Sequence, residues 1–287
     1  MRFGRLCVSL FVLVAVALLT GCRQNVDLEA LAALSKSVGD SQAAFASLSE
    51  DFHQSCVRTV GWQRAADPNT FSDCAEEARA ARQWTSADSV VTAYIASLGA
   101  LAGGASDPGD YGISDFFQTL GNAGVTKTFK ADQLKAATGF TKSLIDNFFK
   151  VKRREELATV IPAVDASLNG LIATLKEVAR TNYVNQLTSE RTAVKLFFEP
   201  NIARAKPGLE TLYAFTFRET EREEQAKIDD KQAAIANYIA ALDQISATHH
   251  KIAEAIKNNR TADVAGIIRG YAAEYGPDIR ALQKAFK

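Results

Sequence analysis

The chain has 287 residues, with 33 basic and 33 acidic side chains and therefore no formal net charge. This balance argues against a nucleic-acid-binding protein, which would carry a strongly basic face. Hydrophobic residues make up 47% of the chain and charged residues 23%, which is typical of a folded globular protein.

The first residues have the three parts of a secretory signal. Arg2 and Arg5 precede an apolar run that ends at Leu19, and small residues follow it. The run has about fourteen residues, fewer than the roughly 20 that a membrane-spanning helix needs. The sequence therefore predicts export and cleavage rather than a retained transmembrane helix.

The end of this signal, Leu19-Thr20-Gly21-Cys22, resembles the lipobox of bacterial lipoproteins. The resemblance implies diacylation of the Cys22 thiol, cleavage that removes residues 1–21, and acylation of the new amino group. Two or more acyl chains, palmitate among them, hold a protein stably at a membrane. The alternative is an ordinary signal peptide with an incidental cysteine.

The resemblance also implies a location. In lipoproteins of bacteria with two membranes, Asp after the lipidated cysteine favours the inner membrane, whereas this chain has Arg23. We therefore expect a lipid anchor at the periplasmic face of the outer membrane. No later stretch has 18 consecutive apolar residues, so we expect no other membrane span. Cleavage would remove Arg2 and Arg5, which leaves 31 basic and 33 acidic residues. We expect the remaining chain, 22–287, to form a single domain.

The first half of that domain predicts two helices. Apolar residues spaced three and four apart predict a helix over about 26–60 that ends near Gly61. Thr70 to Asp73 resembles a capping box, which predicts the start of a second helix that runs to about 102. Its apolar stripe contains Trp84, Val91, Tyr94, Leu98 and Leu101.

Residues 103–130 differ from the rest of the chain. They contain six glycines and one proline, and only 113–120 is typical of a short helix. A long irregular segment in a compact domain is usually functional or disordered, and its aromatic residues argue against disorder. We expect either a buried cap over one end of the bundle or a binding surface made of Tyr111, Phe116, Phe117 and Phe129.

Two long helices with regular apolar seams are predicted in the second half. The first seam consists of Leu157, Ile161, Val164, Leu168, Leu171, Leu175 and Val178, in the spacing of a coiled coil. Asn182 and Asn185 continue it as a predicted polar layer, after which the apolar phase is shifted to Tyr183, Leu187, Val194 and Phe197. Pro162 predicts a kink near 158–162.

A connection is predicted from Pro200 to Pro207, followed by a helix over about 208–257. Its seam is Ile228, Ile235, Tyr238, Leu242, Ile245, Ile252 and Ile256. No segment alternates in the period of a strand. The sequence therefore predicts an all-α fold, an elongated antiparallel bundle with coiled-coil-like helices about 70 Å long.

Cys56 and Cys74 are the thiols that remain after lipidation of Cys22. Each lies nine residues from a predicted turn near residue 65, so a helical hairpin would place them at the same level. Because export leads to an oxidising compartment, and because no C-x-x-C motif suggests redox or metal chemistry, we expect a structural disulfide.

Motifs for catalysis, metals or cofactors are weak. His53 alone beside Cys56 does not make a zinc site, and His250 with Glu254 has no evident third ligand. His249 continues the seam of its helix and is expected at the edge of the core. We therefore expect no metal, no cofactor and no enzymatic activity.

These features favour a lipid-anchored periplasmic envelope protein that acts as a non-enzymatic scaffold or protein-binding module. Its partners would be the membrane, through Cys22, and another protein. The alternative is a small-molecule or lipid-binding protein with a pocket under residues 103–130.

Overall fold

The computed structural model describes residues 38, 41–102, 129–144, 157–205, 208, 211–258, 260, 266–267, 280–282 and 284–286. This part of the chain is helical and contains no strand, which confirms the all-α prediction. Its main elements are α3 Gln42–Ala66, α4 Ala75–Ala102, α6 Ala131–Ser143, α7 Leu157–Glu177, the π-helix η3 Val178–Tyr183, α8 Val184–Arg204 and α9 Thr211–Lys257.

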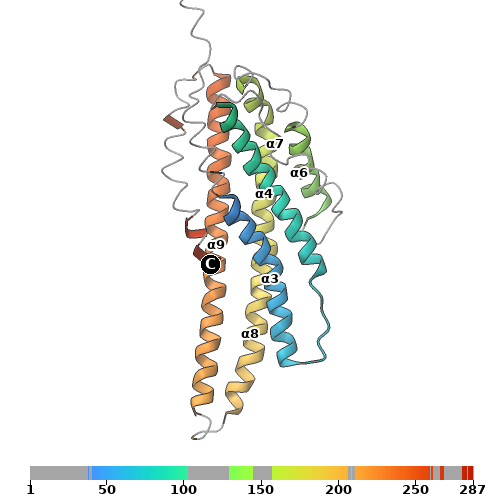
Figure 1. The fold of residues 1–287 in the computed structure, drawn as a ribbon, viewed down its shortest axis with the longest axis vertical. Helices are drawn as coiled ribbons and strands as arrows, with labels where there is room; N and C mark the ends of the chain where they lie inside the picture. The colour runs from blue at the N-terminus through green and yellow to red at the C-terminus, as the bar shows by residue number, and fades with distance from the viewer. Residues whose placement is uncertain are drawn as a thin grey trace, which may run out of the picture.

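Two long antiparallel helices form the axis of the molecule (Figure 1). One is the continuous run of 48 residues from Leu157 to Arg204, which joins α7, η3 and α8. The other is α9, with 47 residues. At 1.5 Å per residue each is about 70 Å long. The α3–α4 hairpin packs beside them, with α3 against α8 and α4 against α7, and α6 packs on α7.

The predicted seams form the core of this bundle. Every residue of the two long seams is buried, with at most 3% of its surface exposed. The side chains of Trp84, Val91, Tyr94 and Leu98 on α4 are buried as well. Burial of a large apolar side chain contributes roughly 1.5–3 kcal/mol, so each seam residue adds substantially to the stability of the bundle.

The run Leu157–Arg204 is long and apolar enough, by length and composition alone, to span a membrane. Half of its most apolar window is buried against other parts of the protein. The central helix of a bundle has the same properties, and Asp165 within this run bonds to His249 of α9.

The π-helix η3 explains the phase shift in the sequence and corrects the predicted polar layer. A π turn places one additional residue in a helix and rotates the following face. As a result Asn182 is half-buried and Asn185 exposed, while Tyr183, Leu187 and Val194 turn into the core. The shifted apolar phase is confirmed at Tyr183, Leu187 and Val194, whereas Phe197 is half-buried and its neighbour Phe198 takes the buried position. The two asparagines do not form a layer of the seam.

Three predicted boundaries are wrong. Helix α3 continues through Gly61, where an added Cβ would meet nothing within 4 Å, and ends at Ala66. Helix α4 begins at Ala75, and the Asp73 carboxylate accepts from the Ala75 amide at 3.3 Å, so the chain is not capped at Thr70. Helix α8 continues through Pro200 to Arg204.

Pro200 is tolerated because it lies one turn from the end of α8, where few backbone bonds remain to be lost. Next to it, the Asn201 side-chain amide donates to the Phe197 carbonyl at 2.6 Å. Pro162 likewise lies within α7, which is helical without a break from Leu157 to Glu177, although the proline nitrogen donates no helical hydrogen bond. The kink near 158–162 stays a prediction.

The expected disulfide joins the ends of the α3–α4 hairpin. Cys56 in α3 and Cys74 just before α4 have Cα atoms 5.9 Å apart, and their sulfur atoms are bonded. The bond closes a loop over a sequence separation of 18 residues. It therefore fixes the start of α4 at one position along α3.

The chain-entropy effect of such a loop is about 3 kcal/mol. We predict that replacement of both Cys56 and Cys74 by Ser lowers the free energy of unfolding by about this amount, measured by denaturant titration. Reduction of the parent chain should have the same effect on stability and none on the double variant. Two alkylatable thiols at these positions in unreduced protein would contradict the assignment.

Candidate functional site

Arg58 is the centre of a cluster of charged side chains between α3, α8 and α9. On α3, Asp51, Ser55 and Arg58 are spaced four and three residues apart, so they share one face of the helix. The guanidinium donates to the Asp51 carboxylate at 2.9 and 3.0 Å and to the Glu190 carboxylate at 2.5 and 3.1 Å. Two carboxylates are thus held by one planar fork of donors.

The other helices complete this cluster, which we call the Arg58 cluster: Asp51, Ser55, Arg58, Tyr183, Glu190 and Lys231. The Tyr183 hydroxyl donates to Asp51, and the Lys231 ammonium lies 3.2 Å from the same carboxylate. The Ser55 hydroxyl donates to Glu190 at 2.6 Å. Tyr183 is the last residue of the π-helix, so the turn that shifts the seam also delivers this hydroxyl.

Burial and neighbouring charge oppose each other at this cluster. Burial would raise the pKa of Asp51, but the hydrogen bond and charge of Arg58, with Tyr183 and Lys231, outweigh it and lower that pKa. Burial would lower the pKa of Arg58, but Glu190 and Asp51 raise it above its usual value. Burial raises the pKa of the Tyr183 hydroxyl. At neutral pH the ion pairs are therefore intact and Tyr183 is a neutral donor.

An open groove of about 530 Å³ adjoins the cluster between α3 and α9. Asp51 and Lys231 belong both to the cluster and to the groove wall. The remaining wall carries both signs of charge and one aromatic ring near the C-terminus, from Ser47, Glu50, Gln54, Lys227, Asp230, Ala285 and Phe286.

A second polar group lies deep in the core at Asp88 of α4. The Trp84 indole donates to the Tyr238 hydroxyl at 2.9 Å, and that hydroxyl donates to Asp88 Oδ1 at 2.6 Å. Asp88 Oδ2 is buried and has no hydrogen-bond partner among the described residues. Burial raises the pKa of this carboxyl to about 8, against the smaller lowering by Tyr238. Asp88 is therefore a neutral acid at pH 7.

A third polar group joins α4, α7 and α9. Asp165 pairs with His249 Nδ1 at 2.8 Å and with His250 Nδ1 at 2.7 Å, and His249 Nε2 lies 2.9 Å from the Tyr94 hydroxyl. Burial would raise the pKa of Asp165, but the two histidines lower it. Tyr94 and His249 are buried, as expected for a core-edge histidine. Glu254 pairs with Lys257 at 2.9 Å instead of meeting His250.

The structure describes only some of the residues predicted to be functional. Cys22, Tyr111, Phe116 and Phe117 lie outside the described residues. Phe129 is fully buried, so its side chain belongs to the core rather than to a binding surface.

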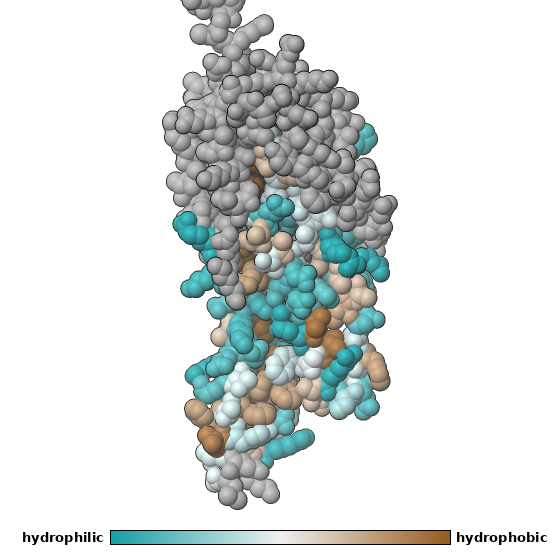
Figure 2. Space-filling view, in the orientation of Figure 1, coloured by the Kyte–Doolittle hydropathy of each residue, from teal (hydrophilic) through white to brown (hydrophobic). Residues whose placement is uncertain are grey.

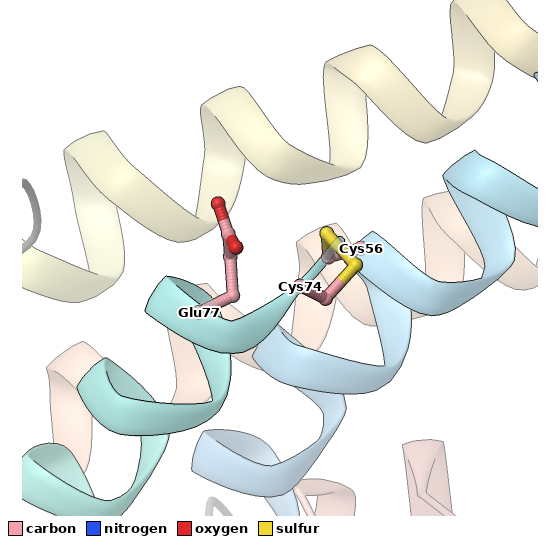
Figure 3. Close-up of side chains that lie close together, drawn as sticks. All are labelled: Cys56, Cys74 and Glu77. Atoms are coloured by element: carbon pink, nitrogen blue, oxygen red, sulfur yellow. A yellow bond between two sulfur atoms is a disulfide. The ribbon is translucent and has the colours of Figure 1, made fainter. Parts of the chain in front are cut away.

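The Cys56–Cys74 pair lies beside the Glu77 carboxylate, and their potential ligand atoms are within 4.8 Å of one another (Figure 3). A metal would need thiolates, but both sulfurs are committed to the disulfide. His53 lies in contact with Glu50, at 3.8 Å. This arrangement supports a covalent tie between helices rather than a metal centre.

The Arg58 cluster was not predicted from the sequence, although one residue indicates it. Glu190 falls on the shifted seam between Leu187 and Val194, and only 2% of its surface is exposed. An acid at a seam position is costly to bury without a cation. It therefore predicts a buried basic partner, but the sequence does not say that this partner is Arg58 of α3.

No protein-family model, curated protein or solved structure matches the chain. Function is therefore inferred from the residues and geometry described above.

We predict that Arg58→Ala destabilises the fold by roughly 3 kcal/mol, because it leaves the buried Glu190 carboxylate without its cation. Arg58→Lys should lose less, since it keeps the charge but not the planar fork. Adding Glu190→Gln to Arg58→Ala should recover part of the loss. Thermal unfolding of these variants measures the effect, and an unchanged midpoint for Arg58→Ala would contradict it.

The raised pKa of Asp88 predicts that the stability of the fold depends on pH. The folded chain keeps this proton up to about pH 8, whereas an unfolded aspartate releases it near pH 4. Between these values the folded state binds more protons, so this group makes stability fall as pH rises. Asp88→Asn, which mimics the neutral acid, should therefore gain stability over the parent from pH 4 to pH 8, by roughly 2 kcal/mol or more.

Denaturant titrations across this pH range measure the difference. Asp243→Asn is the matched control, because that carboxylate is exposed and pairs with Lys176 at the surface. Parallel stability curves for the parent and Asp88→Asn would show that Asp88 is ionised in the folded chain.

Proposed function

We propose that this chain is a lipid-anchored periplasmic envelope protein that is not an enzyme and that binds another protein through the groove between α3 and α9. The lipobox at Cys22 and the following Arg23 support attachment at the periplasmic face of the outer membrane. The groove beside the Arg58 cluster is the single observation that carries the binding role.

The chemistry of the groove favours a protein partner over a small molecule. Small-molecule sites enclose most of their ligand in a largely apolar cavity. This groove is open, and its wall presents exposed Glu50, Lys227 and Asp230 together with Phe286. Charges of both signs can pair with a partner of complementary charge, and an aromatic side chain is of the kind that is enriched in protein interfaces.

The rigidity of the groove wall also supports binding. Asp51 and Lys231 are only 13% and 14% exposed, and they pair with each other. Arg58 and Tyr183 hold Asp51 from behind, so the wall would lose little conformational entropy when a partner docks. The other polar groups, at Asp88 and Asp165, lie between packed helices and tie them together, which supports a structural rather than a catalytic role.

The alternative, a ligand pocket under residues 103–130, concerns a segment outside the described residues, apart from the buried Phe129 and the exposed Lys130. It stays a prediction of the sequence.

Site-specific photo-cross-linking in cells tests the proposal. A photoreactive residue at Ser47 or Gln54 should capture a discrete partner, whereas one at Ala247, exposed elsewhere on α9, should not. The charge exchange Lys227→Asp with Asp230→Lys should abolish the cross-link without loss of folding. Equal cross-linking from Ala247 would refute the groove as the binding site.

The anchor is tested in the same cells. The parent chain should incorporate labelled palmitate and the Cys22→Ala variant should not. If Cys22→Ala still carries the label, the lipid anchor is assigned to the wrong residue.

A further inference from the structure

The end of the molecule where α8 meets α9 carries a concentrated apolar surface. Leu196 on α8 and three side chains on the first turns of α9 are 47–76% exposed, and we call these four residues the tip: Leu196, Leu212, Tyr213 and Phe215. Of the large hydrophobic residues that are exposed in the described part of the chain, only Val57 and Phe71 lie outside it. Figure 2 shows hydrophobic residues at this lower end of the molecule.

A packed aromatic base supports the tip. The Phe217 ring lies 4.2 Å from Tyr213 and 5.4 Å from Phe198, measured between centroids. Trp62 of α3 closes the other side, 5.4 Å from Phe197 and 5.3 Å from Phe198. The exposed side chains are therefore held on an ordered helical end rather than on a loose loop.

Charge is distributed unevenly along this end of the molecule. Between residues 195 and 218 the described charged side chains are the exposed Lys195, Glu199, Arg204 and Arg218, which gives three cations against one anion. In the sequence of the turn, Lys206 and Glu210 cancel each other. Beyond Arg218 the sign reverses, because 219–224 contains four acids and one arginine.

The exposed apolar side chains and the flanking cations favour some binding partners of the tip over others. A second copy of the tip would bring like charges together, which opposes association. A protein partner would have to supply a pocket for these protruding side chains, whereas the interface of a bilayer accepts them without one. Apolar and aromatic side chains with flanking basic residues are the features of an element that enters the interface of an anionic membrane.

We propose that the tip docks on an anionic lipid bilayer, with Leu212, Tyr213 and Phe215 entering the headgroup layer, Leu196 at its outer edge, and Lys195, Arg204 and Arg218 against the lipid phosphates. The acids from Glu219 onward stay outside the headgroup layer and limit the depth of entry. This contact is additional to the proposed lipid anchor.

The length of chain before α3 allows both contacts on one membrane. Sixteen residues separate Cys22 from Val38, which is buried in the core, and they can span at most about 55 Å. Helix α3, which runs from Gln42 toward the tip, is about 37 Å long. The membrane that would hold Cys22 is therefore within reach of the tip.

Depth-dependent fluorescence quenching tests the docking directly. Phe215→Trp places a reporter in the tip, and Ala247→Trp places a matched reporter on α9 away from it. Each full chain, purified from cells in detergent, is reconstituted on vesicles of equal parts phosphatidylglycerol and phosphatidylcholine with brominated acyl chains. Subtraction of the parent spectrum removes the signal of Trp62 and Trp84.

Emission from Phe215→Trp should shift to shorter wavelength and be quenched, while emission from Ala247→Trp should not. Neutralising each of Lys195, Arg204 and Arg218 with Gln should lower the ratio of docked to free tip about fivefold on anionic vesicles. The same changes should have no effect on pure phosphatidylcholine. Leu212→Ser should weaken docking on both, and because Leu212 is 76% exposed this change should leave the thermal midpoint unchanged.

Equal quenching of the two reporters, or none, would overturn the proposal. So would a cross-linker at Leu212 that captures an envelope protein while Phe215→Trp stays unquenched, since the tip would then be a protein contact. A chain that lacks palmitate can be added to the vesicles from solution. Failure of the anchor and failure of the tip are therefore measured separately.

Discussion

Between Val178 and Tyr183 the central helix changes to π-type hydrogen bonding, and the packing of both halves of the bundle depends on this change. Upstream, the buried face of α7 meets α4, α6 and α9. Downstream, α8 must meet α3 as well as α9. A straight α-helix that kept the upstream phase would turn Asn182 and Asn185 inward and leave Leu187 and Val194 away from the seam. The inserted residue rotates the face so that one helix serves two sets of neighbours.

The buried polar groups fix the position of each helix along its neighbours. Long apolar seams are chemically repetitive, so helices packed by seams alone could shift by one heptad at small cost. Pairing of Arg58 with Glu190, of Tyr238 with Asp88 and of His249 with Asp165 is possible in one register only. Slippage would leave these groups buried without partners, which costs several kcal/mol for a charge. The disulfide adds a covalent reference point for the α3–α4 hairpin.

Periodicity in the sequence predicted the parts of the fold that depend on repeated spacing. The seams of α7 and α9, the all-α class and the pairing of Cys56 with Cys74 are found in the structure. Boundaries were less predictable because they depend on local compensation. Helix α8 continues through Pro200 near its end, α3 continues through an exposed Gly61, and Asp73 rather than Thr70 accepts the bond at the start of α4.

The candidate site was beyond sequence reasoning for a different reason. Glu190 could be recognised as a misplaced acid, but Arg58 and Lys231 lie 132 and 41 residues away from it in the chain. Only the three-dimensional packing of α3, α8 and α9 selects them from the 33 basic residues.

The two long helices also set the length of the molecule. Each residue adds about 1.5 Å along the axis but also turns the helix by about 100°, so length and facing direction are coupled. A single insertion into the seam of α9 would rotate everything beyond it out of the core. Heptad steps in both helices, of about 10.5 Å each, come closest to preserving the seam. Evolution can therefore change the length of this bundle only in coarse steps that are paired between the two helices.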